Sequence, residues 1–375
     1  MSDQRQSSAE AIELVPFGGH TIGHSTENGS IVLLNETARL MLAVYQQSAG
    51  KAQAVEQISR LLQQDRAMVE TDFDAMLAHW SDAGLFSGKH AALLAGARLL
   101  DKFCWNHCVT LGKNKVYLRC NDLAAGSVLN RLLEPLLTDD EDEEISDVVD
   151  LIATDGSFLV AVNGRHYWFS EEFAGCRHMF LQALLETALG PGEVGAVLHA
   201  SAVQLGQSTL LLSGTSGSGK STMMAQLVMA GGTYLGDDLL ALSASGDHVF
   251  GLSANISIKP GSQEILDRQL KSNGNPPLPD ADEYGFRYWQ TESDQNWHKA
   301  THLCFPEFRA ELTDPKLEQI DELEALHRLT AAGSRACGRN NSIRPMADLC
   351  QNIPAFSLRY GPGEDVAPIL QELVA

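Results

Sequence analysis

Apolar residues follow a helical spacing through the first quarter of the chain. A short apolar run, "SIVLLN", ends at Asn35, which is a good N-cap for a helix predicted over 36–47. Two further helical runs, "KAQAVEQISRLLQQ" and "RAMVETDFDAMLAHWSDAG", follow, and the second ends at Gly84, a natural C-terminal stop. With a short strand after Gly84, this order outlines a winged helix. We therefore predict a winged-helix-like α+β domain over residues 10–87.

The pattern then becomes less regular. Residues 88–107 are predicted to be a helical linker. Residues 108–198 alternate strand-like and helical runs, such as "NKVYLRC", "GSVLNRLLEPLL", "FLVAVNGRHYWFS" and "CRHMFLQALLETAL", and predict a smaller α+β lead-in. The acidic run "TDDEDEEISD" between them is typical of a solvated loop.

Residues 199–375 show the alternation of an α/β core. The runs "VLHASAVQL", "STLLLSG", "TYLGDDLLALS" and "ISIKP" are predicted strands, and a helix follows the second of them. The stretch "SNGNPPLPDADEYG" predicts a long surface loop near the site, and the chain closes with helical runs around a strand, "AFSLRY". We expect the lead-in and this core to form one α/β domain over 108–375.

The sequence "GTSGSGKS" fits the phosphate-binding pattern G-x-x-x-x-G-K-[ST] between an apolar strand and a helical run. Glycine lets the backbone N–H groups of such a loop turn inward around a phosphate. Lys220 would neutralise the β- and γ-phosphates, and the Ser221 hydroxyl would coordinate Mg²⁺. We predict ATP and Mg²⁺ as ligands, with the nucleotide held by Gly214, Thr215, Ser216, Gly217, Ser218, Gly219, Lys220, Ser221 and Thr222.

Two adjacent aspartates, Asp237 and Asp238, lie 17 and 18 residues after Lys220. We place them on the next strand, beside the loop strand, where adjacent side chains point to opposite faces. One carboxylate would meet the metal or a neighbouring imidazole. The other would face an incoming hydroxyl and accept its proton as charge moves during phosphoryl transfer.

Charge and cysteine usage narrow the partners and the compartment. The 375 residues carry a net charge of −21, which disfavours nucleic acid or an anionic membrane as a partner. The start of the chain lacks the pattern of a secretory signal, and seven scattered cysteines favour free thiols, so we expect a cytoplasmic protein. "CWNHC" at 104–108 has the spacing of half a metal clip, but no second pair follows, and the alternative is a half-buried polar and aromatic segment.

The motifs "LHAS", "GTSGSGKS" and "LGDD", in this order and spacing, resemble the HPr kinase/phosphorylase family. The resemblance is firm over 198–260 and extends in pattern over 108–375. It implies a P-loop fold of the HPr kinase/PEP carboxykinase type, and a homo-oligomer is possible because HPr kinases form hexamers. It also implies roles for individual residues: Lys220 and Ser221 bind phosphate and Mg²⁺, Asp238 accepts the proton, Asp237 is its partner at the metal, and His199 is hydrogen-bonded in the aspartate cluster. A single histidine such as His199 also has a purely structural reading.

The chain departs from that family after the aspartates. Bacterial HPr kinases carry a glutamate before Ile-Arg-Gly, whereas the stretch here is "NISIKPG", with Lys259 as its basic residue. This departure argues against the reverse phosphorylase reaction and against HPr as the substrate. "ISIKP" and "CFPEFR" are more similar to HPr kinase-related enzymes of peptide-modification gene clusters. Lys259 and Arg309 are candidate anion contacts, with ordinary surface charges as the alternative.

The N-terminal region resembles the PqqD-like family, also called the RiPP recognition element. The residues that carry the resemblance are "IVLLNETARLML", "AVEQISRLL" and "VETDFDAMLAHWSDAGLF". Members bind a precursor or leader peptide as an added β-strand. The alternative is a helical docking or dimerisation domain.

Together the two resemblances predict a kinase that phosphorylates a Ser or Thr of a peptide or small protein held by the N-terminal domain. Tethering would raise the local concentration of the acceptor near Asp238. Two alternatives are a small-molecule kinase with a regulatory N-terminal domain and a non-catalytic, ATP-gated peptide chaperone.

Overall fold

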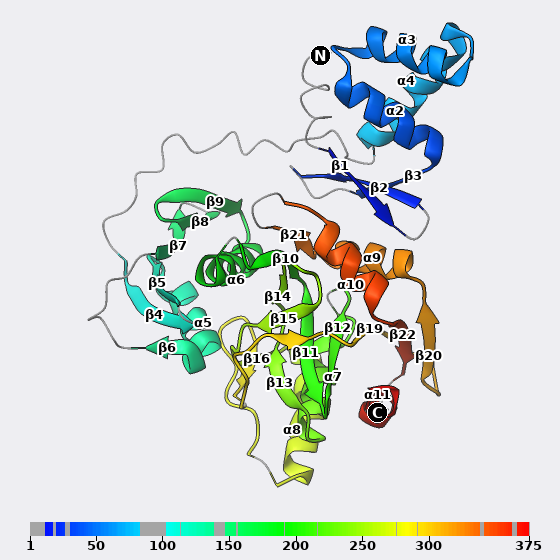
Figure 1. Cartoon of the computed structure of the whole chain (residues 1–375). Helices are drawn as coiled ribbons and strands as arrows, with labels where there is room; N and C mark the ends of the chain where they lie inside the picture. Colours follow the sequence, from blue (N-terminus) through cyan, green and yellow to red (C-terminus); the bar gives the residue numbers. More distant parts are fainter. Residues whose placement is uncertain are drawn as a thin grey trace.

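The protein is a mixed α/β molecule with several sheets, seen here in a computed structural model (Figure 1). The structure describes residues 12–17, 20–26, 31–82, 103–112, 114–138, 147–154, 157–190, 192–215, 217–274, 276–290, 292–337, 341–361 and 366–374.

The N-terminal unit is a three-stranded antiparallel sheet covered by three helices. Its strands are β1 (Ile12–Phe17), β2 (His20–Ser25) and β3 (Ile31–Leu34), in the order β1-β2-β3, and its helices are α2 (Glu36–Gln47), α3 (Lys51–Leu62) and α4 (Arg66–Asp82). The Asn35 side chain accepts a hydrogen bond from the Ala38 N–H, which confirms the predicted cap. The β1–β2 hairpin was not predicted, and the strand expected after Gly84 lies outside the described residues.

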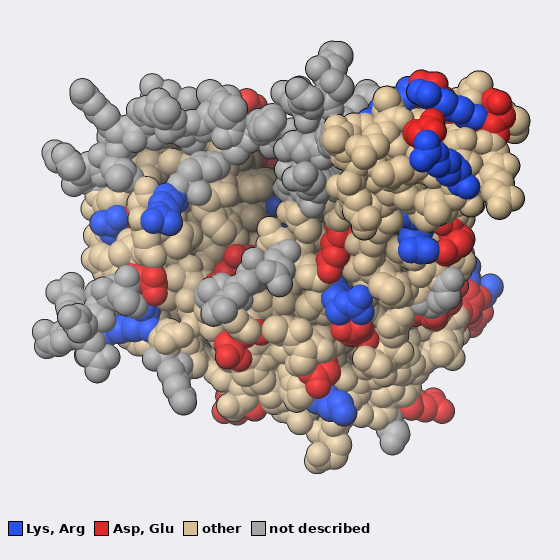
Figure 2. All heavy atoms as spheres, turned by 45° about the horizontal axis from the view of Figure 1, so that its top comes forward, with Lys and Arg blue, Asp and Glu red and all other residues tan. Residues whose placement is uncertain are grey.

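The apolar stripes of the three helices form a core of their own. Tyr45 packs edge-on against Phe73, with ring centroids 5.3 Å apart, and Trp80 is fully buried in the same cluster. On the outer surface, Lys51 pairs with Asp74 and Arg60 with Glu56. Figure 2 shows the result on one face, where acidic and basic side chains of the described residues are interspersed.

A second sheet, with strand order β6-β4-β5-β7-β8-β9, forms the region predicted as the lead-in. Its elements are β4 (Trp105–Leu111), β5 (Asn114–Cys120), α5 (Leu123–Leu133), the 3-10 turn η1 (Glu134–Leu136), β6 (Leu137–Thr138), β7 (Asp147–Thr154), β8 (Ser157–Val162), β9 (Arg165–Ser170) and α6 (Phe173–Leu189). Strand β4 begins at Trp105, inside the range expected to be a linker, and it includes most of "CWNHC".

Helix α6 is apolar around most of its circumference because it is covered on two sides. Phe180, Leu184 and Leu185 are fully buried in one cluster with residues of the second sheet and with Val197 and Ala241 of the central core. The helix therefore joins the two layers, as Figure 1 also shows.

Two further sheets form the core. A five-stranded sheet has the order β18-β15-β14-β10-β21, a six-stranded sheet has the order β13-β11-β12-β19-β22-β20, and β16 pairs with β17. Their strands are β10 (Val194–Leu198), β11 (Ala200–Leu205), β12 (Ser208–Ser213), β13 (Thr233–Gly236), β14 (Leu240–Ser243), β15 (His248–Gly251), β16 (Ile256–Ile258), β17 (Arg287–Trp289), β18 (His298–Lys299), β19 (His302–Phe308), β20 (Lys316–Ile320), β21 (Arg335–Ala336) and β22 (Ala355–Tyr360). The helices are α7 (Lys220–Met229), α8 (Pro260–Ser272), α9 (Glu322–Ala331), α10 (Arg344–Asn352) and α11 (Ala367–Val374).

The six-stranded sheet is buried on both faces. Along β12, Leu211 packs into the cluster that contains α9 and α10, whereas Leu210 and Leu212 pack into the cluster that contains α7, α8 and α11. This alternation is the two-residue period of a strand. It explains why "STLLLSG" is continuously apolar instead of alternating.

The β1–β2 hairpin docks onto α10. Val15, Phe17 and Ile22 are buried in the same cluster as α9 and α10. The Glu13 carboxylate accepts hydrogen bonds from the Ser342 hydroxyl at 2.5 Å and from the Ile343 N–H at 3.0 Å. The N-terminal unit is thus fixed to the core through β1, which leaves β3 as the other edge of its sheet. Within the described ranges, no helix has the length and apolar character needed to span a bilayer.

Candidate functional site

The site lies where the chain passes twice between the two core sheets. His199 separates β10 of the five-stranded sheet from β11 of the six-stranded sheet. Asp237 and Asp238 separate β13 from β14, which belong to the same two sheets in the reverse order. Because β10 pairs with β14 and β11 pairs with β13, the two crossing points lie side by side.

This arrangement corrects two predictions. "VLHASAVQL" and "TYLGDDLLALS" are each two strands, so the aspartates do not lie on one strand with alternating faces. The strand β13 also pairs with β11 and not with the loop strand β12. The bend has a local cause, since Asp238 has a φ of 66°, in the left-handed region that aspartate tolerates better than most residues.

The glycine-rich loop follows β12 and opens α7, as predicted. Gly217 and Gly219 have φ values of 87° and 96°, which few other residues adopt. A Cβ on Gly219 would lie 1.7 Å from the Tyr360 hydroxyl, which donates to the Ser218 carbonyl at 3.1 Å. Lys220 is only 6% exposed, and its Nζ donates to the Gly214 carbonyl at 2.6 Å. Burial lowers the pKa of Lys220, and the nearby Asp238 and Asp237 offset this only in part.

Asp237 lies beneath the loop. One carboxylate oxygen accepts a hydrogen bond from Ser201, while the buried second oxygen, Oδ2, has no hydrogen-bond partner among the described atoms. Burial and the neighbouring Asp238 charge raise the pKa of Asp237 to about 6, although the Ser201 and Ser221 hydroxyls favour its ionised form. The ionised form of this carboxylate is therefore disfavoured, and a nearby cation would stabilise it.

Asp238 faces the cavity, with 38% of its side chain exposed, and its Oδ1 lies 4.0 Å from His199 Nε2. Burial alone would raise the pKa of Asp238, but the positive charges of His199 in its protonated form, of Arg177 and of Lys220 outweigh burial and lower it. Burial and, to a smaller extent, the charge of Lys220 lower the pKa of His199 to about 4. The His199 ring stacks on the ring of His178, with the ring centroids 5.2 Å apart. At neutral pH the site holds an ionised Asp238 beside a neutral imidazole.

A cavity of about 1090 Å³ joins these groups. Its walls come from the glycine-rich loop and α7, the start of α8, the β9–α6 region and β21. The charged residues that line it are mostly basic: Arg177, Lys220, Lys259, Arg268 and Arg335, with Asp238 as the acidic one. In a chain with a net charge of −21, this concentration of positive charge favours an anionic ligand such as a polyphosphate.

The donor set fits Mg²⁺. The unpartnered Oδ2 of Asp237 and the hydroxyl of Ser221 are hard oxygen ligands next to the phosphate loop. Among the residues that the structure describes, no group of three or more His, Cys, Asp or Glu side chains could hold a metal. A protein site of one carboxylate and one hydroxyl suits Mg²⁺, which commonly takes its remaining ligands from water and substrate phosphates.

The other predicted residues divide into three groups. Gly217, Ser218, Ser221, Thr222 and Lys259 line the cavity with Lys220, although the Thr222 hydroxyl donates to Ser262 at 2.6 Å. Gly214 and Thr215 accept from Lys220 through their carbonyls, and Ser216 lies outside the described residues. Arg309 is engaged by Glu307 and does not line the cavity.

Sequence reasoning missed several residues that the fold brings to the cavity. His178 and Arg177 lie on α6, Arg335 on β21 and Tyr360 on β22. The helix "CRHMFLQALLETAL" carries one signal, because its only basic residues, Arg177 and His178, are adjacent at one end of an otherwise apolar helix.

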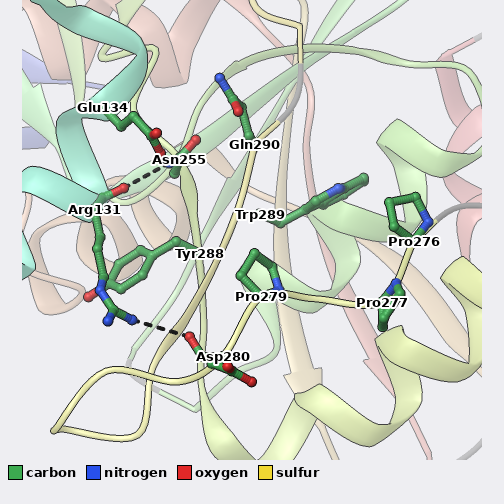
Figure 3. A pocket seen from close by; sticks show the side chains of 10 residues that line it. All are labelled: Arg131, Glu134, Asn255, Pro276, Pro277, Pro279, Asp280, Tyr288, Trp289 and Gln290. Carbon is green, nitrogen blue, oxygen red and sulfur yellow. Dashed lines mark hydrogen bonds between the residues drawn. The ribbon is translucent and has the colours of Figure 1, made fainter.

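A second cavity, of about 560 Å³, lies beside the Pro-rich loop (Figure 3). Pro276, Pro277 and Pro279 surround Trp289, while Asn255 is held by the Arg131 carbonyl at 2.7 Å. The loop predicted from "SNGNPPLPDADEYG" thus lines this separate cavity.

Comparison with known proteins gives a distant structural match. No protein-family model and no curated protein matches the sequence. Among solved structures, the chain is similar to the Hpr(Ser) kinase/phosphatase from Coxiella burnetii, with 13% sequence identity and a TM-score of 0.25. The match covers 47% of this chain and 87% of that one. At this TM-score the likeness carries no argument about activity.

Proposed function

We propose that the chain is an ATP- and Mg²⁺-dependent kinase that phosphorylates a Ser or Thr hydroxyl of a peptide or small protein. The observation that carries the proposal is the convergence of Asp238, Lys220 and the glycine-rich loop on one basic cavity. A protein that only binds a nucleotide has no need of an ionised carboxylate facing that cavity.

Each side chain has a separate task in the proposed reaction. The loop N–H groups and Lys220 bind the phosphates, and Ser221 and Asp237 would hold Mg²⁺, which neutralises phosphate charge when bound. The acceptor oxygen bonds to the γ-phosphorus as the bond to the β–γ bridging oxygen breaks, and ADP leaves. Asp238 takes the hydroxyl proton. The neutral His199 lies beside the Asp238 carboxylate without cancelling its charge.

The sheet of the N-terminal unit is the feature that favours a peptide as the phosphoryl acceptor. Since β1 lies against α10, a peptide would add at β3, where Leu33 is 46% exposed. Fixing this sheet to the core keeps a bound peptide within a limited distance of the cavity and raises its effective concentration there.

The test is incubation with ATP, Mg²⁺ and candidate peptides, followed by mass spectrometry, for the wild type and Asp238→Asn. We expect a phosphate mass increment on a peptide, reduced about 10²–10⁴-fold in the variant, with nucleotide binding retained. Phosphate on a small molecule with peptides untouched would favour a metabolite kinase. Nucleotide-dependent peptide binding without transfer would favour a chaperone.

A further inference from the structure

Arg177 and Arg335, two of the three arginines that line the site cavity among the described residues, form no ion pair with a carboxylate there. Most arginines in the described part of the chain pair with carboxylates, such as Arg119 with Asp150 and Arg287 with Asp267. In contrast, no ion pair or hydrogen bond within the described ranges engages the guanidinium of Arg177 or Arg335, and the Arg177 Nε is buried. Leaving an N–H donor of a charged group buried and unpaired costs free energy. We therefore expect a ligand that accepts a hydrogen bond from this N–H to bind well.

Aromatic rings hold both guanidinium groups in place. Arg177 lies over Phe286 at 5.3 Å, and Arg335 lies over Trp168 at 4.8 Å. Stacking on a ring leaves the N–H edge of a guanidinium available to an anion. Both arginines therefore present fixed donors to the cavity.

These arginines belong to a different wall from the nucleotide loop. Arg177 lies on α6 and Arg335 on β21, whereas Lys220 opens α7. The charge of Arg177 acts on Asp238, and that of Arg335 acts on His178, which stacks on His199. Arg177 thus acts directly on the carboxylate that would take the acceptor's proton, and both arginines line the cavity that this carboxylate faces.

We propose that Arg177 and Arg335 form an anion subsite for the phosphoryl acceptor, which carries a carboxylate next to its hydroxyl. This inference rests on the proposed kinase function and narrows its substrate to a Ser or Thr with an acidic neighbour. The carboxylate could be an adjacent Asp or Glu side chain or the C-terminus of a peptide that ends in Ser.

The experiment compares peptides that differ only beside the acceptor: Asp, Asn or Lys next to Ser, and a terminal Ser with a free or an amidated carboxyl group. We expect the wild type to prefer the anionic member by at least about tenfold in kcat/KM. The preference should disappear in Arg177→Gln and Arg335→Gln and persist in Arg165→Gln, a control on an exposed arginine outside the cavity. Arg335→Glu should favour the Lys peptide.

The comparison uses ratios because Arg177→Gln also changes the electrostatics of Asp238. Equal use of all peptides by the wild type would overturn the subsite while leaving the kinase intact. Weaker nucleotide binding in both variants, with an unchanged peptide ratio, would assign the arginines to ATP and also overturn it. If no peptide is phosphorylated, calorimetry tests the subsite separately by measuring the binding of peptides in which Ala replaces the acceptor Ser, with a non-hydrolysable ATP analogue present. Tighter binding of the Asp peptide than of the Asn peptide, abolished by Arg177→Gln, supports the subsite. Equal binding of the two peptides overturns it.

Discussion

The hydroxyl of Ser201 donates a hydrogen bond to the carboxylate of Asp237, across the point where two paired strands pass from one core sheet to the other. That bond supports one oxygen of a carboxylate whose other oxygen has no partner among the described atoms. The site is therefore built around a buried charge that the protein alone does not satisfy.

Asp237→Asn should stabilise the protein at neutral pH while removing Mg²⁺-dependent activity. The pKa of Asp237 is raised from 3.8 to about 6, so its ionised form carries a penalty that is fully present above pH 6. We expect a gain on the order of 1–3 kcal/mol at pH 7.5 that shrinks as the pH falls toward 4, measured by urea unfolding. Asp247→Asn is the matched control and should give a loss, since hydrogen bonds from Ser245 and His248 lower the pKa of Asp247 to about 2. A variant less stable than the wild type at pH 7.5 would contradict the account of Asp237.

His199 should make the protein less stable in acid. Its pKa falls from 6.5 to about 4 because of burial and Lys220, so the unfolded chain binds this proton more readily than the folded protein. Stability from this group is full above pH 6.5 and decreases as the pH falls toward 4. The difference in unfolding free energy between His199→Gln and the wild type should therefore shift in favour of the variant from pH 7 to pH 5. An unchanged difference would contradict the buried, neutral imidazole.

Gly219→Ala should disrupt the loop through Tyr360. The added Cβ would overlap the Tyr360 hydroxyl and require a left-handed φ, which costs at least about 1 kcal/mol. Removing that hydroxyl with Tyr360→Phe should recover part of the lost stability in the double variant, because the backbone cost remains. Thermal unfolding and nucleotide binding of the two single variants and the double variant measure this coupling. Strict additivity would mean that the two residues do not interact.

Substitutions at Asp238 should separate the effect of its backbone conformation on stability from the effect of its charge on activity. Asp238 has a left-handed φ, which Gly adopts freely, Asn adopts more readily than most residues, and Ala adopts at a cost of about 1 kcal/mol. All three should lose phosphoryl transfer, but only Asp238→Ala should lower the melting temperature appreciably. If Asp238→Asn retained full activity, the carboxylate would not be the proton acceptor.

Glu13 should couple the N-terminal unit to the core. Burial raises the pKa of Glu13, but hydrogen bonds from His24, Ser342 and Ile343 outweigh burial and lower it. Its stabilisation is thus present above the ordinary glutamate pKa and is lost as the pH falls through the lowered value. Glu13→Ala should cost about 1–2 kcal/mol and expose α10 to hydrogen exchange, whereas Glu36→Ala, at an exposed pair with Arg39, should change little. Unchanged exchange at Ile343 would show that Glu13 does not hold the contact.

Elements whose causes are local could be predicted from the sequence alone. Asn35 caps its helix because the side chain needs only the next turn, and the glycine-rich loop precedes α7 because its glycines allow positive φ values. The resemblance implied that His199 is hydrogen-bonded in the aspartate cluster; the structure places its Nε2 4.0 Å from Asp238 Oδ1, which is near but beyond hydrogen-bond distance.

The other features of the site depend on which strands pair, so they could be seen only in the folded chain. Strand-like runs such as "VLHASAVQL" contain no local mark of the point where the chain changes sheets, so the bends at His199 and Asp238 could not be read from periodicity. Arg177 and Arg335 are far apart in sequence and line the same cavity as Asp238 only because α6 is packed between two layers and β21 pairs with β10. Long-range packing, which no short window of residues encodes, built the cavity.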